Sequence, residues 1–129
     1  MSIFKNLFGG SVKPGKPMET TDATFETDVL KSELPALLDF WSPTCMPCQV
    51  MGGLLRELGP EYAGRVNIYK LNVSQYSETA MRYRVRSIPT LLFIKEGKIV
   101  DHVIGLIPMD TLRQKLGKLA PTLVSQNLG

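Results

Sequence analysis

The sequence predicts one α/β domain with a central mixed β-sheet that is flanked by helices on both faces. Three observations support this prediction. The chain has 129 residues, of which 43% are apolar and 21% charged, and these values are typical of one globular domain. Apolar runs of strand length alternate along the chain with amphipathic segments of helix length. Near its end, the turn Glu96-Gly97 joins two strand-like runs into a hairpin.

The expected order of elements is β-α-β-α-β-α-β-β-α. Thr24 is expected to cap the first helix, with Glu26 and Asp28 in its first turn, and Pro35 ends it. Strands are expected at residues 18–21, 36–41, 66–73, 90–94 and 98–104, and further helices at about 47–58, 77–83 and 109–119.

The run over residues 36–41 is almost entirely apolar, as in a buried central strand, although it contains Asp39. In the helix that follows, Gly52-Gly53 weakens the middle and allows a bend, and Gly59-Pro60 ends or kinks it.

The chain is expected to consist of an extension (residues 1–17), a domain (18–120) and a C-terminal tail (121–129). In the extension, one helical face carries the apolar side chains Ile3, Phe4, Leu7 and Phe8, and glycines and prolines follow. One interpretation is a small amphipathic helix that contacts a partner or a membrane surface, too short for firm attachment. The other is a flexible tail or a segment packed on the domain itself.

Charge and cysteine content restrict the function classes. Residues 1–18 contain three lysines and no acidic residue, and the remainder has 12 basic and 12 acidic residues. A neutral body argues against nucleic-acid binding, which usually requires a basic folded surface. No apolar run approaches the roughly 18 residues of a membrane span. Two cysteines are too few for the disulfide framework of a secreted domain, and no secretory signal is evident, so a cytoplasmic location is expected.

The strongest chemical signal is the pair Cys45 and Cys48, spaced C-x-x-C where a strand leads into a helix. Two cysteines three positions apart at a helix start lie on one face, near disulfide distance. The unpaired N–H groups and the dipole at a helix N-terminus favour the thiolate form of Cys45. Pro47 suits the first turn because it lacks an N–H group. Cys48 lies one turn further on and is expected to be more buried.

This arrangement predicts dithiol–disulfide exchange. The Cys45 thiolate attacks a substrate disulfide, and Cys48 then attacks the Cys45 sulfur and releases the reduced substrate. Cys48 must lose a proton in that second step. Asp39 is the candidate acceptor, because desolvation raises the pKa of a carboxyl group in an apolar strand. A water molecule is a possible link between the two groups.

Other interpretations of these residues stay open. A structural zinc usually needs four ligands, and the chain offers two cysteines and His102, so a metal site is disfavoured. A purely structural disulfide would close a very short loop and stabilise little. Asp39 is alternatively a structural acid paired with Lys70. The Ile88-Pro89 bond is expected to be trans from base rates alone.

Together these motifs resemble the thioredoxin family. The resemblance covers about residues 21–119, with the motifs in the right order and spacing: Asp39-Phe40-Trp41, Cys45-x-Pro47-Cys48, Lys70-Leu71-Asn72, Ile88-Pro89-Thr90 and Gly105. It implies the thioredoxin fold and a disulfide reductase with no bound cofactor. The redox group would be the Cys45–Cys48 disulfide, and electrons would come from NADPH through a thioredoxin reductase.

The resemblance also implies roles for individual residues. Cys45 would be the nucleophile, Cys48 the resolving thiol, and Asp39 and Lys70 the buried acid and its neighbour. The implied substrate-binding residues are Trp41, Met46, Pro47, Ile88, Pro89 and Gly105, with Pro89 in the cis form. The implied partners are disulfide-containing proteins and a thioredoxin reductase, and the chain is expected to be a monomer that binds neither nucleic acid nor, firmly, a membrane.

Some positions depart from the family pattern. Thr44 stands where tryptophan is usual and Met46 where glycine is usual, and Gly53 replaces the proline that kinks the helix. These changes motivate a second hypothesis, a dedicated reductant of one partner enzyme such as a peroxidase. A third hypothesis is a binding module whose redox chemistry is incidental.

Overall fold

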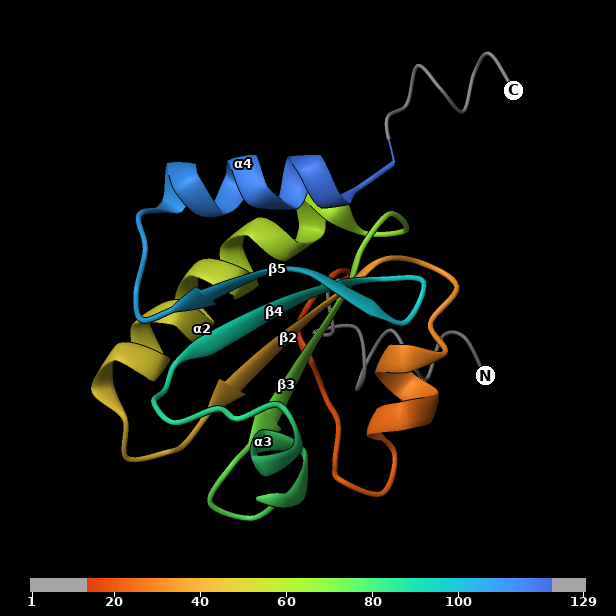
Figure 1. Cartoon of the computed structure of the whole chain (residues 1–129). Helices are drawn as coiled ribbons and strands as arrows, with labels where there is room; N and C mark the ends of the chain where they lie inside the picture. Colours follow the sequence, from red (N-terminus) through yellow and green to blue (C-terminus); the bar gives the residue numbers. More distant parts are fainter. Residues whose placement is uncertain (1–13, 122–129) are drawn as a thin grey trace, which may run out of the picture.

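The computed structural model describes residues 14–121, and Figure 1 shows the path of the chain. The apolar face at residues 3–8 and the tail at 122–129 lie outside the described residues. The strands are β1 (Met18–Glu19), β2 (Ala36–Trp41), β3 (Asn67–Asn72), β4 (Thr90–Lys95) and β5 (Lys98–Ile104). The helices are the short turns η1 (Glu26–Leu30) and η2 (Gly59–Tyr62), and α2 (Met46–Leu58), α3 (Glu78–Arg82) and α4 (Met109–Leu119).

The five strands form one mixed sheet in the order β1-β3-β2-β4-β5. β2 pairs in parallel with β3 and antiparallel with β4, so it occupies the centre. This position explains why its sequence is apolar throughout, since a central strand is covered on both faces. Asp39 lies between Lys70 of β3 and Leu91 of β4 in register. The predicted α/β class and order of elements are confirmed.

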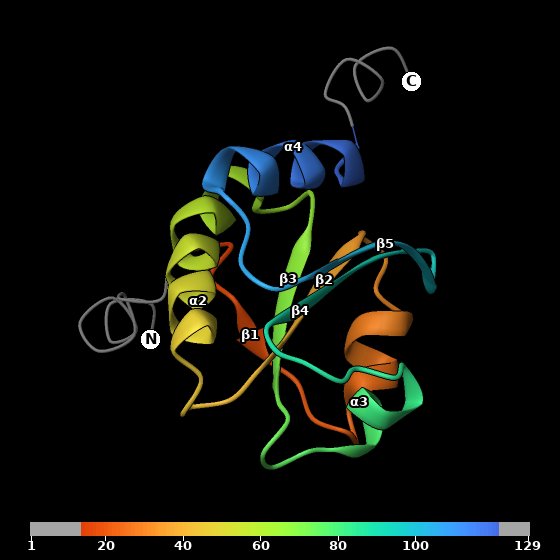
Figure 2. The same cartoon turned by 60° about the vertical axis from the view of Figure 1, so that its left-hand side comes forward.

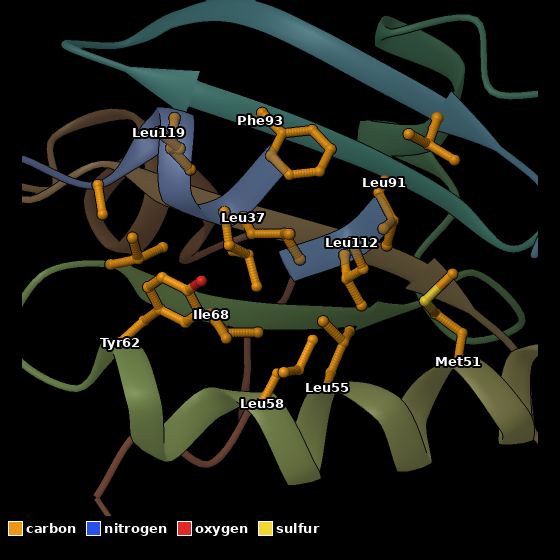
Figure 3. Close-up of a cluster of buried hydrophobic side chains, with 14 residues drawn as sticks. Leu37, Met51, Leu55, Leu58, Tyr62, Ile68, Leu91, Phe93, Leu112 and Leu119 are labelled. Atoms are coloured by element: carbon orange, nitrogen blue, oxygen red, sulfur yellow. The ribbon is translucent and has the colours of Figure 1, made fainter. Parts of the chain in front are cut away.

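Helices cover both faces of the sheet, as Figure 2 shows. Helices α2 and α4 pack on one face, and η1 and α3 lie on the other. Alternate residues of β2 serve the two faces: Leu37 joins the cluster beneath α2 and α4, and Leu38 joins the cluster beneath η1 and α3. Figure 3 shows the first cluster, where Leu55 and Leu58 of α2 point toward the sheet. These two cores fix the end of β2, from which the loop that carries Cys45 starts.

The start of η1 differs from the expectation. The N-cap residue is Phe25, which makes no side-chain capping hydrogen bond, and Thr24 lies one residue before it. The Thr21 hydroxyl accepts the Thr24 N–H at 3.1 Å, and the Thr24 hydroxyl accepts the Thr21 N–H at 3.1 Å. This reciprocal pair satisfies two N–H groups at the helix entrance, as a capping box does. The helix is also shorter than expected, and the N–H of Lys31 bonds to the carbonyl of Glu26 in a five-residue spacing.

The segment before β1 is packed against the end of α2. The backbone of Gly15 meets the backbone of Gly59, and a Cβ at Gly15 would collide with the Gly59 carbonyl. Gly15 has φ +86°, a conformation that side chains other than glycine disfavour. In Figure 2 this segment (red) runs beside α2. The segment around Gly15 is therefore packed on the domain.

Helix α2 runs from Met46 to Leu58 without a break at Gly52-Gly53. The Gly53→Ala variant is expected to raise the free energy of unfolding by about 1 kcal/mol, because glycine is a poor helix residue. A Cβ at Gly53 would find only the Arg56 guanidinium, at 3.8 Å. Urea unfolding of the oxidised protein measures the change. Gly15→Ala is the opposing control and is expected to lower the free energy of unfolding. A higher free energy of unfolding for Gly15→Ala, or a lower one for Gly53→Ala, would contradict this account of the two glycines.

Candidate active site

The two cysteines lie where β2 passes through a short loop into α2. They form a disulfide, with their Cα atoms 5.2 Å apart. Cys45 is the N-cap of α2, and Pro47 lies in the first turn as predicted. Cys48 is 2% exposed, whereas Cys45 is half-buried. An incoming molecule therefore reaches the first sulfur and not the second.

The helix start is arranged to stabilise negative charge on Cys45. Its sulfur accepts the backbone N–H of Cys48 at 3.2 Å. The sulfur thus takes the place of the side-chain oxygen that usually caps a helix, and it meets the positive end of the helix dipole. Reduction of the disulfide would leave charge on this sulfur, where the N–H group and the dipole favour it.

The loop before β4 lies against the outer sulfur. The Ile88-Pro89 bond is cis, as the resemblance implied and base rates alone did not. The carbonyl oxygen of Ile88 is 3.8 Å from the Cys45 sulfur. The N–H of Gly105 donates to the Pro89 carbonyl at 2.8 Å, which ties the end of β5 to the same place. Ile88, Pro89 and Gly105 are therefore gathered beside Cys45.

Trp41 is half-buried at the end of β2 and lines a cavity together with Cys48. The Lys70 ammonium lies 5.0 Å from the centre of the Trp41 ring, within range of a cation–π interaction. Met46 is 73% exposed, and Pro47 is exposed beside it. Two exposed apolar residues thus directly follow Cys45 in the chain.

A cavity of about 210 Å³ lies behind the disulfide. Cys48 and Asp39 both line it, together with Lys16, Pro17, Trp41, Gln49, Gly52, Arg56 and Lys70. Asp39 is 2% exposed, and its Oδ1 atom has no hydrogen-bond partner among the described residues. Burial raises the pKa of Asp39 to about 7, and the Lys70 charge opposes that rise. The direction matches the expectation from its apolar strand.

Asp39 and Lys70 are neighbours in register on β2 and β3. They are not among the ion pairs formed within residues 14–121. No group of three or more His, Cys, Asp or Glu side chains in that part of the chain is arranged to hold a metal ion. His102 is exposed on β5, outside the cavity that Cys48 and Asp39 share.

Sequence reasoning did not place Lys16 or Arg56 at this site. Lys16 belongs to the expected extension at residues 1–17, and Arg56 lies eight positions after Cys48 on a helix. The one available signal was the pair Gly52-Gly53, because two glycines in a helix leave room for a neighbouring side chain.

The family model that matches this chain is described as Thioredoxin and covers residues 16–118. This chain belongs to the thioredoxin family. It is 45% identical over 100 residues to a thioredoxin of Synechocystis sp., covering 78% of this chain and 94% of that protein. It is 46% identical over 95 residues to a thioredoxin of Haemophilus influenzae, covering 74% and 89%. The M-type chloroplastic thioredoxin of Pisum sativum is 45% identical over 97 residues, covering 75% and 56%.

Membership of the thioredoxin family and the Cys45–Cys48 disulfide together establish a thiol–disulfide oxidoreductase of thioredoxin fold. The redox group is the disulfide itself. Among the helices of residues 14–121, none has the length and apolar character needed to cross a membrane.

Proposed function

We propose that this thioredoxin-family protein works mainly as a reductant of protein disulfides. The observation that carries the proposal is the asymmetry of the pair: Cys45 is reachable at a helix N-terminus, and Cys48 is buried behind it. In the complete reaction the two thiols of the protein lose two electrons and two protons. The substrate disulfide gains them and becomes two thiols.

The first step is attack of the Cys45 thiolate on one sulfur of the substrate disulfide. This forms a mixed disulfide and releases the other substrate sulfur as a thiolate, which takes a proton. Cys48 then attacks the Cys45 sulfur, so that the second substrate sulfur leaves as a thiolate and Cys45–Cys48 closes. Asp39 takes the Cys48 proton, supported by the cavity that both residues line. Before this transfer, the Lys70 charge favours the ionised form of Asp39 that accepts the proton.

The substrate-binding surface in this proposal surrounds Cys45. An extended substrate segment lies along the backbone of Ile88, whose carbonyl faces the sulfur. Its apolar side chains contact the residues that border the disulfide: Trp41, Met46, Pro47, Pro89 and Gly105. The close approach of Ile88 to Cys45 supports this placement, since it puts substrate backbone next to the reacting sulfur.

The supply of electrons is part of the same proposal. NADPH, through a thioredoxin reductase, returns the Cys45–Cys48 pair to the dithiol form, and no cofactor is bound by the chain itself. We propose that the protein acts as a cytoplasmic monomer. Its cysteine usage supports this location, because both cysteines belong to the exchange pair and none remains for a structural disulfide.

Insulin reduction tests the proposed function. With dithiothreitol as the electron source, the wild type is expected to accelerate insulin precipitation well above the rate with dithiothreitol alone. NADPH with a bacterial thioredoxin reductase is expected to replace dithiothreitol. Failure with both electron sources contradicts a general reductase, and failure with the reductase alone contradicts the proposed electron supply.

A dedicated partner is the second candidate function, and the 73% exposed Met46 favours it. An exposed, flexible thioether next to the reactive sulfur adds a contact that a glycine cannot make. Met46→Gly is expected to lower kcat/KM for a true protein partner about threefold to tenfold, as loss of one apolar contact does. The rate with the small disulfide hydroxyethyl disulfide is expected to stay unchanged. An equal loss with both substrates would contradict this role.

A further inference from the structure

Two cations at the mouth of the cavity behind the disulfide have no part in the proposed reaction so far. Lys16 comes from the segment before β1, and Arg56 comes from the second half of α2. We refer to these two residues as the cationic rim. Both line the cavity that also contains Asp39 and Cys48. The rim therefore faces the groups between which the proton would move.

The Arg56 guanidinium lies beside the two glycines in the middle of α2. A Cβ on Gly52 would lie 3.4 Å from one guanidinium nitrogen of Arg56, and a Cβ on Gly53 would lie 3.8 Å from the other. Helical side chains lean toward the helix N-terminus, so Arg56 extends back along α2 in the direction of Cys48. Glycine is unfavourable inside a helix, and here it leaves a flat surface on which the guanidinium lies.

Lys16 is held by a separate contact. Gly15, immediately before it, packs backbone to backbone on Gly59. After it, β1 pairs with β3, and the Thr20 N–H donates to the Lys70 carbonyl at 2.9 Å. The segment is thus fixed on both sides of Lys16. Two independent packing features bring two positive charges to one cavity.

The charges that face Asp39 have one sign. Lys70 of β3, Arg56 of α2 and Lys16 of the segment before β1 line its cavity, and Asp39 is the only carboxylate among the lining residues in the described part of the chain. On the β4 side of Asp39, the residue in register is Leu91, which carries no charge. A positive charge near a buried carboxyl group favours its ionised form, and solvent weakens this effect for Lys16 and Arg56 because both residues are exposed.

We propose that Lys16 and Arg56 are positioning residues that increase the ionised fraction of Asp39 near neutral pH, so that more of it is ready to take the proton of Cys48. This role rests on the proposed function, in which Asp39 is the proton acceptor. Lys16 and Arg56 act through Asp39 and do not touch the substrate disulfide. In their absence, Asp39 keeps its proton to higher pH and accepts the Cys48 proton less readily.

The direct test is titration of Asp39 in the full-length oxidised protein, followed by the carbon-13 NMR signal of its carboxyl group. The disulfide removes cysteine titration from this measurement. Arg56→Gln and Lys16→Gln are each expected to move the midpoint upward by about half a pH unit, a small shift because both charges are exposed and screened by solvent. Arg56→Lys is expected to restore the wild-type midpoint. Lys98→Gln, which removes the same charge from the exposed β5 strand, is the matched control and is expected to change nothing.

The kinetic test measures single-turnover oxidation of the reduced protein by hydroxyethyl disulfide, a neutral probe, from pH 5 to 10. The Arg56→Gln and Lys16→Gln rates at pH 7 are expected to fall about twofold to threefold, which corresponds to the half-unit shift. In an Asp39→Asn background the same substitutions are expected to have no effect.

Unchanged midpoints in both rim variants overturn the proposal, and so does an equal rate loss in the Asp39→Asn background. Lys16→Gln alone decides the matter if Arg56→Gln does not fold. The NMR midpoint is independent of catalysis, so a wild type that fails to reduce insulin refutes the proposed function without deciding the electrostatic role of the rim.

Discussion

Replacing Cys48 with serine is expected to abolish turnover and to leave Cys45 covalently joined to its substrates. Cys48 is the only thiol that can attack the Cys45 sulfur from inside the protein, since the chain has two cysteines. Without it the mixed disulfide has no internal route to resolution and accumulates. Insulin reduction is expected to fall on the order of a thousandfold or more, as for other enzymes that lose an essential reactive group.

Non-reducing electrophoresis and mass spectrometry measure the trapped species. Cys45→Ser is the matched control, and it is expected to be equally inactive but to trap nothing, because the remaining sulfur is 2% exposed. Trapping through Cys48, or turnover in either serine variant, would contradict the assigned order of attack. A serine variant that keeps its biological role without reductase activity would instead support the binding-module hypothesis.

Neutralising Asp39 is expected to stabilise the folded, oxidised protein at pH 8 by about 2–4 kcal/mol. Burial raises the pKa of Asp39 from 3.8 to about 7. Between these two values the folded state holds a proton that the unfolded state has released, so the stability falls as the pH rises. Three pKa units correspond to about 4 kcal/mol lost by the wild type between pH 4 and pH 7. Asp39→Asn removes this loss but retains a buried polar amide, which reduces the gain.

Urea unfolding at pH 5 and pH 8 measures this effect in the oxidised wild type and in Asp39→Asn. Asp101→Asn is the contrasting control, because the Lys115 ammonium, the largest of several causes, lowers the pKa of that carboxyl group. Asp101→Asn is expected to lower the free energy of unfolding slightly at pH 8, as loss of an exposed ion pair does. A pH-independent difference between the wild type and Asp39→Asn would contradict burial of the charge as the cause.

The sequence predicted the sheet and the exchange pair because their signals are local. The apolar run around Asp39 indicates a central strand, and a carboxyl group enclosed by such a run must be desolvated wherever the strand is placed. The spacing of Cys45 and Cys48 determines their distance as soon as a helix starts there. In these cases the neighbours along the chain already define the environment.

Other features depend on contacts between segments that are distant in the sequence, and the periodicity of apolar residues does not predict such contacts. Gly15 and Gly59 are 44 positions apart, and nothing in either segment indicates that their backbones meet. The expected cap at Thr24 was wrong because the Thr24 side chain bonds to the backbone of Thr21, and η1 starts after Phe25 without a side-chain cap. The cis bond before Pro89 was implied by resemblance alone, since a single X-Pro pair carries little information about its isomer.

The β5 strand also determines how the sheet ends. Its pairing with β4 slips by one residue, so that Phe93 faces Asp101 but the next residue, Ile94, faces Ile99. The extra residue, Val100, bulges out of the outermost strand, and the ladder of free backbone groups along that border is interrupted. A second chain laid along this border would lose its hydrogen-bond register midway, so the sheet resists growth into fibres despite the exposed Ile99 and Val100 side chains.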